Sequence, residues 1–233
     1  MPDEYVGFVS DDFFLECIKE VCEHYSQESQ KTMKELQTNG LDSFKMVFDI
    51  MNSNSTVEGW IGGETIRQLD KTISNWIGDF HQKLLGGVDG WEDLGKGHET
   101  KVDLKKDDDT VFIELKNKHN TTKGSDMIHY YDNLKRIVDE YPSSVGYFAF
   151  ITPKSGNAGN ETWKIKGRDP DERVRKLWGT EVYSLITGDK DALLKTWSAL
   201  PSGISAVINS DYSFSEADAK KMSEIFSYAL TRG

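Results

Sequence analysis

The sequence has few cysteines and no long apolar run, which are the features that disulfide-stabilised, zinc-binding and membrane proteins need. Its 233 residues include only two cysteines, Cys17 and Cys22, whose spacing of five in an expected helix suits neither a disulfide framework nor a zinc site. No apolar run approaches the roughly 20 residues of a membrane helix, and the opening MPDEYVGF lacks the basic region of a signal peptide. We therefore expect a cytoplasmic protein that does not contact membranes.

Positive charge is also scarce, because the formal net charge is −11. At first sight this argues against a nucleic-acid partner, but the distribution of charge matters more than its sum. Residues 1–60 hold 12 acidic and four basic residues, whereas residues 153–177 hold seven basic and four acidic ones. A locally basic surface on an acidic protein therefore stays possible.

The order of periodic segments predicts an α/β (α+β) fold in one domain, residues 1–233. Helical spacing of apolar residues is expected over 11–37, 57–85, about 125–141 and from 215 onward. Short strands are expected near 100–105 and 110–118, and buried strands at SVGYFAFIT (144–152) and EVYSLITG (181–188). The prediction is a central mixed sheet flanked by helices, with an N-terminal helical region (1–56), a core (57–152) and a C-terminal part (153–233).

One motif resembles a nucleotide-binding loop but lacks its context. GWEDLGKG, residues 90–97, has the G-x-x-x-x-G-K spacing, yet Gly97 stands where a Ser or Thr would hold magnesium. The segment follows a helix and precedes a strand, and Glu92 and Asp93 would face the phosphate oxygens. We expect a flexible connection here and no nucleotide cofactor.

Charged residues occur inside the two short strands, in HETKVDLKKDDDTVFIELKNKHNTTKG (98–124). Alternation puts Glu114 and Lys116 on the face opposite Val111, Ile113 and Leu115. In KVDL, Val102 and Leu104 should share the apolar face, which leaves Asp103 on the other. If Lys106 pairs with Val111 around the loop DDDT, Asp103 lies opposite Glu114. This register makes both carboxylates and Lys116 converge.

Such a cluster has a functional and a structural explanation. Two facing carboxylates repel each other unless a cation lies between them, and their hard oxygen atoms suit Mg²⁺. A neighbouring lysine could orient the attacking water of a phosphodiester hydrolysis. A solvated edge hairpin with cross-strand ion pairs would use similar residues, and the acid-x-Lys pattern recurs at Asp103-Leu-Lys105 and Asp218-Ala-Lys220.

The order helix, VDL strand, IELK strand, helix and buried strand resembles the PD-(D/E)XK nuclease superfamily. ELKNKHNTTKG and the chain length resemble a group of type II restriction endonucleases that cut GGNCC-type palindromes. The resemblance is good over residues 57–152 and makes Asp103 and Glu114 the metal ligands and, with Lys116, the catalytic residues. Val102 replaces the proline of the superfamily name. An acid from the preceding helix often joins the site, with Glu64 the best candidate and Glu99 behind it.

The resemblance implies an Mg²⁺-dependent, site-specific endonuclease for double-stranded DNA, acting as a homodimer on a palindrome and leaving 5′-phosphate and 3′-hydroxyl ends. Residues 153–233 would then serve DNA recognition, dimerisation and the C-terminal helix. The alternatives are a repair or junction-resolving nuclease and a non-catalytic DNA- or protein-binding module. The candidate DNA contacts, from side chains that can donate to phosphates or bases, are Asn117, Lys118, His119, Asn120, Lys123, Arg168, Arg173 and Arg175.

Overall fold

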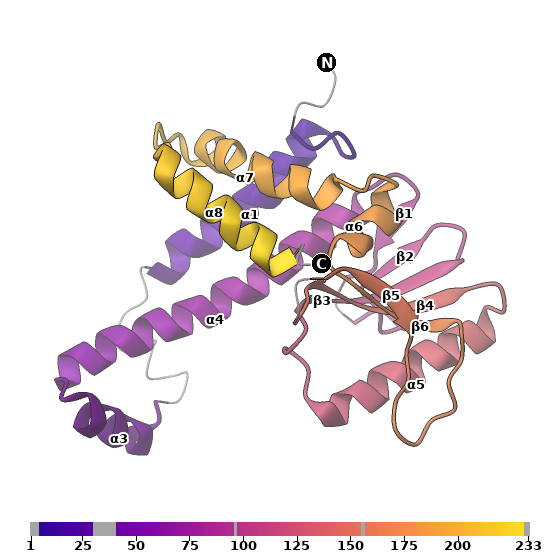
Figure 1. Cartoon of the computed structure of the whole chain (residues 1–233), viewed down its shortest axis with the longest axis horizontal. Coiled ribbons are helices and arrows are strands. Elements are labelled where there is room, and N and C mark those ends of the chain that lie inside the picture. Colours follow the sequence, from indigo (N-terminus) through magenta and orange to yellow (C-terminus); the bar gives the residue numbers. More distant parts are fainter. Residues whose placement is uncertain (1–4, 30–40, 96, 155–156, 231–233) are drawn as a thin grey trace.

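The structure, a computed structural model, describes residues 5–29, 41–95, 97–154 and 157–230, and a mixed sheet lies at its centre. Six strands within these residues form the order β1-β2-β3-β4-β6-β5 (Figure 1). β3, β4 and β6 run parallel, while β1, β2 and β5 pair antiparallel with their neighbours. The strands are β1 Trp91–Asp93, β2 Leu104–Lys106, β3 Val111–Lys118, β4 Val145–Thr152, β5 Gly159–Thr162 and β6 Val174–Trp178. The predicted mixed sheet is confirmed.

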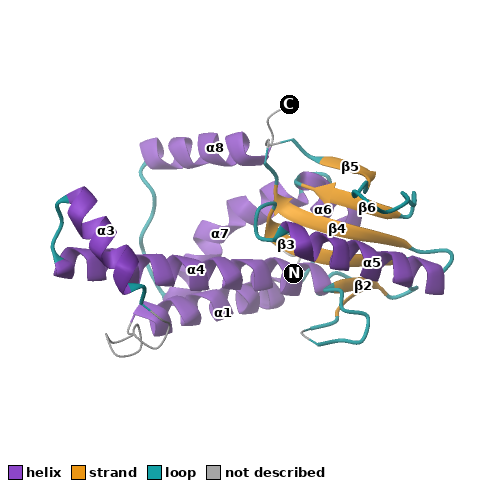
Figure 2. Ribbon diagram, turned by 90° about the horizontal axis from the view of Figure 1, so that it is seen from below, coloured by secondary structure: helices purple, strands orange, loops and turns teal. Residues whose placement is uncertain are grey.

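Helices cover both faces of this sheet (Figure 2). On one face α5 packs against a buried cluster that includes Phe112 of β3 and Phe148 of β4. On the other face the α4 and α6 helices meet the sheet, and α1 and α7 pack against them in a second cluster that includes Ile113 and Leu115. The helices are α1 Asp11–Ser29, α3 Ser43–Ser53, α4 Val57–Gly86, α5 Gly124–Glu140, α6 Thr180–Thr187, α7 Ala192–Ile208 and α8 Glu216–Leu230.

The longest helix is α4, and its ends are set by local chemistry. The hydroxyl of Thr56 accepts a hydrogen bond of 3.0 Å from the backbone three residues on, which caps the first turn. Phe80 and Leu84 are buried on the face that meets the sheet and α1. After the helix, a Cβ at Gly87 would lie 2.1 Å from the ring of Phe13, so a larger residue there would have to displace this ring. The predicted helix over 57–85 is confirmed to within one residue.

Several other predictions are also confirmed. SVGYFAFIT forms β4, an inner strand between β3 and β6. The helix expected near 125–141 is α5, and the expected terminal helix is α8, where the Ser215 hydroxyl accepts from the backbone amide of Asp218 at 3.1 Å. The first expected helix is α1 as far as Ser29, and its predicted continuation over 30–37 lies outside the described residues.

The prediction of a buried strand at EVYSLITG is wrong, because this segment lies in α6. Its buried residues Val182, Tyr183 and Ile186 fit one face of a helix, and Gly188 ends the helix with a φ of +73°. Short apolar runs do not distinguish a buried strand from a buried helix by periodicity alone. The sheet also continues past residue 152, the expected end of the core, into β5 and β6.

The placement of Val102 beside Leu104 is a second correction. Leu104 packs in the cluster on the α4 side, whereas Val102 packs with Phe112 on the α5 side. Lys101 has a φ of +55° and Asp103 lies in a bend before β2, so strand alternation does not reach residue 102.

None of the helices in the described part of the chain has the length and apolar character needed to cross a bilayer.

Candidate active site

The hairpin of β2 and β3 brings the two predicted acidic residues close together. Leu104 pairs with Ile113 and Lys105 with Phe112, so the predicted register is confirmed within β2. The backbone amide of Asp103 donates to the carbonyl oxygen of Ile113 at 3.0 Å, one residue short of Glu114, so the ladder shifts at Asp103. The pairing of Asp103 directly opposite Glu114 stays a prediction, and the two carboxylates meet through their side chains.

Lys116 joins these two carboxylates. Its ammonium Nζ forms an ion pair with Glu114 and lies 3.8 Å from Oδ2 of Asp103. Oδ2 of Asp103 also accepts a 2.6 Å hydrogen bond from the backbone amide of Leu115, which fixes the carboxylate against β3. The ring of Tyr130 in α5 lies 5.1 Å from Nζ of Lys116, a cation–π contact that sequence reasoning missed.

Burial gives this cluster unusual electrostatics. The side chain of Glu114 is only 7% exposed, and those of Asp103 and Lys116 are 24% and 23% exposed. Burial, and then the charge of Asp103, raises the pKa of Glu114 to about 7 despite the opposing effect of Lys116. Burial also raises the pKa of Asp103. Burial alone would lower the pKa of Lys116, but the two carboxylates outweigh it and raise that pKa.

The raised pKa of Glu114 predicts a pH-dependent stability of the metal-free protein. The folded state keeps a proton on Glu114 up to about pH 7, whereas the unfolded chain loses it near the ordinary glutamate value. The folded form therefore binds more protons, and stability falls as pH rises through this window, by at most about 1.4 kcal/mol per pH unit for one proton. We expect the melting temperature in a chelator to fall from pH 5.5 to pH 8.

Two variants isolate this effect in the same thermal melts. Glu114→Gln removes the titrating group and should flatten the pH dependence. Asp108→Asn is the matched control on the same hairpin, because hydrogen bonds from Thr110 and Lys106 lower the pKa of Asp108 to about 2, outside the window. A wild-type melting temperature that does not change with pH, or a Gln variant with the wild-type slope, would contradict the assignment.

Further acidic residues lie near Asp103. The charges of Asp93 in β1 and Asp79 in α4 contribute to its raised pKa, after burial. Asp79 lies one residue before the buried Phe80, on the turn of α4 whose Gly78 faces the side chain of Asn117 in β3. Sequence reasoning missed Asp79, although its place beside the apolar stripe of α4 was the available signal.

Glu64, the acid predicted from the helix, is not brought to this cluster. It lies in α4 15 residues before Asp79, which at about 1.5 Å per residue corresponds to roughly 22 Å along the helix. Its carboxylate is buried against Arg67 and also accepts from Gln68 at 3.1 Å. Glu99 lies in the turn before β2, exposed to solvent.

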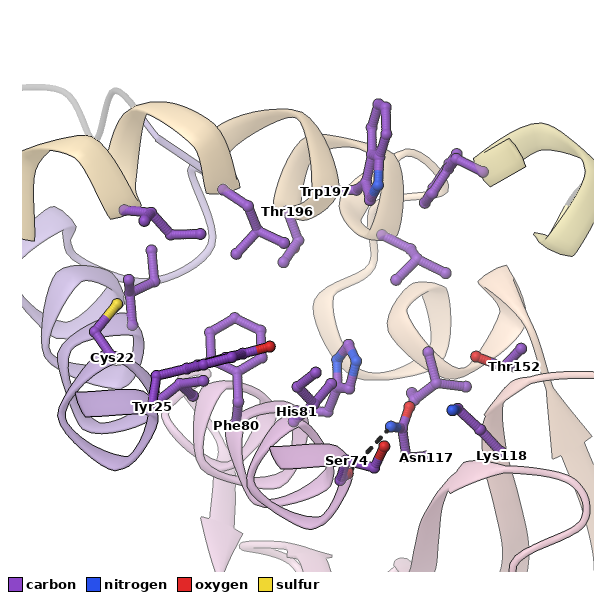
Figure 3. A pocket seen from close by; sticks show the side chains of 18 of the residues that line it. Cys22, Tyr25, Ser74, Phe80, His81, Asn117, Lys118, Thr152, Thr196 and Trp197 are labelled. Atoms are coloured by element: carbon purple, nitrogen blue, oxygen red, sulfur yellow. Dashed lines mark hydrogen bonds between the residues drawn. The ribbon is translucent and has the colours of Figure 1, made fainter. Parts of the chain in front are cut away.

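The predicted polar residues after Lys116 gather at the end of β3. Asn117 and Lys118 line an apolar pocket of about 670 Å³ between the sheet and the α1, α4, α7 and α8 helices (Figure 3). The side-chain amide of Asn117 donates to the carbonyl oxygen of Ser74 in α4 at 3.4 Å, which ties the strand end to that helix. His119, Asn120 and Lys123 are exposed in the loop that follows, before α5.

The three predicted arginines have partners within the chain. Arg168 binds Asp132 of α5 through two hydrogen bonds of 2.7 and 2.8 Å. Arg173 pairs with Asp171 and donates to the carbonyl oxygen of Val138 at 2.6 Å. Arg175 lies in the inner strand β6, where the sequence indicated a basic surface segment, and it donates to Asn160 at 2.7 Å. Their DNA contacts stay a prediction.

The cluster offers oxygen ligands to a metal ion from two residues. Within the described residues, no three His, Cys, Asp or Glu side chains form a ready metal-binding group. The facing carboxylates of Asp103 and Glu114 fit a hard cation that keeps several of its water ligands, as Mg²⁺ does. A divalent ion there would favour the charged carboxylates and so oppose the burial and the neighbouring acidic charges that raise both pKa values.

This geometry agrees with the relatives of the chain. A family model described as Eco47II restriction endonuclease matches residues 6–209. The chain belongs to the Eco47II restriction endonuclease family. It is 31% identical over 204 residues to the type II restriction enzyme Sau96I of Staphylococcus aureus, covering 82% of this chain and 77% of that protein. It is 29% identical over 212 residues to the type II restriction enzyme Eco47II of Escherichia coli, covering 87% of each.

Membership in the Eco47II family fixes the class of reaction. Type II restriction enzymes are site-specific deoxyribonucleases, so this chain is a site-specific DNA endonuclease, and the predicted resemblance is confirmed. Enzymes of this class act on double-stranded DNA and generally depend on a divalent metal ion. The matched residues include the hairpin with Asp103, Glu114 and Lys116 and the whole of α3 and α4.

Proposed function

We propose that this endonuclease depends on Mg²⁺ and cuts DNA at the β2–β3 hairpin, with Asp103 and Glu114 as metal ligands and Lys116 as the catalytic lysine. The observation that carries the proposal is the buried pair of facing carboxylates that share one ammonium group. Desolvating three charged groups costs free energy that their mutual pairing does not fully return, so a purely structural role would be a poor use of this cluster. A solvated ion-pair hairpin would leave them exposed.

Each residue has a distinct part in the proposed reaction. Bound Mg²⁺ would polarise the scissile phosphate and lower the pKa of the attacking water. The Leu115 amide holds Oδ2 of Asp103, which leaves Oδ1 for the ion. Glu114 would hold the ion as a carboxylate, because a nearby divalent charge would favour its ionised form against the burial that raises its pKa. The ammonium of Lys116 orients the water and stabilises the negative charge that develops on the phosphate.

A third acidic residue from the preceding helix is part of the proposal, but it is Asp79 rather than Glu64. Asp79 is close enough to Asp103 to affect its pKa, whereas Glu64 lies far along α4 with Arg67 as its partner. A third carboxylate would position a water ligand or a second ion.

The DNA backbone should contact the end of β3. Lys118 continues the strand that carries Lys116, with Asn117 next to it in the chain and the exposed donors His119, Asn120 and Lys123 in the loop that follows. Because the protein as a whole is strongly acidic, its affinity must come from such a local group of donors and cations. We propose a GGNCC-like palindrome as the recognition site, 5′-phosphate and 3′-hydroxyl products, a homodimer, and the cytoplasm as the place of action.

A plasmid digest with Mg²⁺ tests this function, with a chelator as the control. We expect discrete fragments whose sequenced ends map to one palindromic site and carry 5′-phosphates. Degradation to a smear, or cutting only at branched DNA, would indicate a repair or junction-resolving nuclease instead. Intact DNA that is nevertheless retarded on a gel would indicate a binding module without turnover.

A further inference from the structure

The short helix α3 has an apolar face that points away from the rest of the molecule. Its residues Phe44, Val47, Phe48 and Met51 follow the spacing of one helical stripe and are 81%, 57%, 69% and 73% exposed. We call these four residues the α3 stripe. None of the eleven residues of this helix, all of which the structure describes, is buried. Monomeric proteins rarely leave a continuous apolar patch of this kind in water.

The helix itself is well formed and attached on its other side. The carboxylate of Asp42 caps it by accepting from the amides of Phe44 and Lys45 at 3.0 Å. Asp49 accepts a 2.9 Å hydrogen bond from Nε1 of Trp60 in α4, and Trp60 is buried. A helix of this length is marginal alone, so these contacts hold it in place. The α3 stripe is therefore a fixed surface of the molecule.

The α3 stripe lies far from the sheet. Figures 1 and 2 place α3 at the end of α4 opposite the strands. The 30 residues of α4 span about 45 Å at 1.5 Å per residue. No contact with the hairpin can therefore cover the α3 stripe within one copy.

The uncharged, apolar side chains of the α3 stripe favour another apolar protein surface as its partner. Its four side chains carry no charge, and the nearby Lys45 is paired with Asp49, so the surface does not suit DNA phosphates. An aromatic side chain has about 150–250 Å² of surface, so the four exposed side chains offer about 500 Å² per copy. Two stripes against each other would bury about 1,000 Å², the least that a specific interface needs.

We infer that the α3 stripe is the surface through which two copies of this chain associate, α3 against α3 about a two-fold axis. Such an axis makes the contact self-complementary, because each copy presents the same patch to the other. Val57 and Ile66 of α4, the helix that holds α3, are also exposed, at 47% and 68%. This assigns association to the N-terminal region, not to residues 153–233 as the sequence indicated.

The inference rests on the proposed homodimer and names the surface through which it forms. The test uses neither DNA nor metal, so the inference can fail independently of the proposed cleavage activity. Sedimentation equilibrium of the full chain at about 1–100 μM should give twice the mass of the 26.4 kDa chain. The double variant Phe44→Asp/Phe48→Asp should weaken association at least about a hundredfold. The monomeric double variant should still fold and melt cooperatively, because both rings that it replaces face solvent.

A matched control comes from α8. Ile225 is 61% exposed, and this helix lies beyond the residues matched by the family. Ile225→Asp adds the same charge to an exposed apolar position and should leave association unchanged. A wild-type chain that stays monomeric, or a double variant that associates like wild type, overturns the inference. Loss of DNA binding in the double variant without any change in association also overturns it, because the stripe would then contact DNA.

Crosslinking tests the two-fold geometry without depending on the aspartate variants. Val47 lies within the stripe, so Val47→Cys should bring two identical thiols close together and give a covalent dimer with a short bis-maleimide reagent. Leu194→Cys in α7, at a position 46% exposed, is the control. Both variants keep the native Cys17 and Cys22, so crosslinking through those thiols would be the same in each. Equal dimer yields from both variants would contradict α3-to-α3 contact.

Discussion

Replacing Lys116 with alanine is expected to slow single-turnover DNA cleavage at least about a hundredfold. Among the described residues, its ammonium is the one cation that pairs with both Asp103 and Glu114, so under the proposed mechanism its loss would remove the charge that stabilises the transition state. The fold should survive, because the hairpin register depends on backbone bonds and on the buried residues Leu104 and Ile113. The rate is measured with saturating DNA and Mg²⁺, and the melting temperature is measured without metal.

Lys106→Ala provides the comparison for Lys116→Ala. Lys106 lies on the paired strand β2 and forms a 3.0 Å ion pair with Asp108 at the solvent-exposed turn. Exposed pairs of this kind contribute about 0–1 kcal/mol, so this variant should cut at nearly the wild-type rate. If Lys116→Ala melts early yet cuts normally, Lys116 is a structural residue and the reaction takes place elsewhere.

Asp103→Asn is expected to abolish cleavage while DNA binding persists or becomes tighter. The amide removes a negative ligand from the proposed ion and at the same time removes repulsion towards the phosphate. Asparagine keeps an oxygen that can accept the hydrogen bond from the Leu115 amide, so the hairpin should keep its shape. Cleavage and gel-shift affinity are measured on the same DNA, with Asp107→Asn in the exposed turn as the control.

Calcium gives an independent check on Asp103. It should support DNA binding by wild type without cutting, since it occupies oxygen sites but is a weaker activator of water than Mg²⁺. Cleavage by Asp103→Asn within tenfold of wild type would remove this residue from the site, and fast cutting in calcium would contradict the proposed ion chemistry.

The sequence predicted those parts of the fold whose pattern is local. The helical period of α4 runs through Phe80 and Leu84 to a glycine stop, and the alternation of β3 has one register that keeps its apolar face buried. α6 was assigned wrongly because eight residues hold too few periods to separate helix from strand. α3 and β6 were not predicted, because their patterns are short and their boundaries depend on contacts with α4 and β4.

In the candidate site, too, the local features could be predicted from the sequence and the long-range ones could not. Asp103, Glu114 and Lys116 lie in or next to one hairpin, so a local pattern was enough to predict that their side chains converge. The sequence named Glu64 and Glu99 as the third acid, whereas Asp79 became a candidate only through the packing of α4 against β3, which no sequence spacing specifies. Arg168 looked available for DNA because its partner Asp132 lies 36 residues away in the chain. The partners of Arg173 and Arg175, Asp171 and Asn160, are nearer in the chain, but the sequence does not show that they bind these arginines.

The continuous α4 helix also has a mechanical consequence. It carries Trp60, which anchors α3, near one end and Asp79, beside the hairpin, towards the other. In a helix, each inserted residue would move one end by about 1.5 Å and rotate it by about 100° relative to the other. Changes close to a whole number of turns, such as about seven residues for two turns or about eleven for three, would keep the α3 stripe facing the same direction. The length of α4 therefore sets the distance and the relative orientation of the α3 stripe and the proposed active site. Insertions or deletions in α4 would preserve that orientation only if they are close to a whole number of turns.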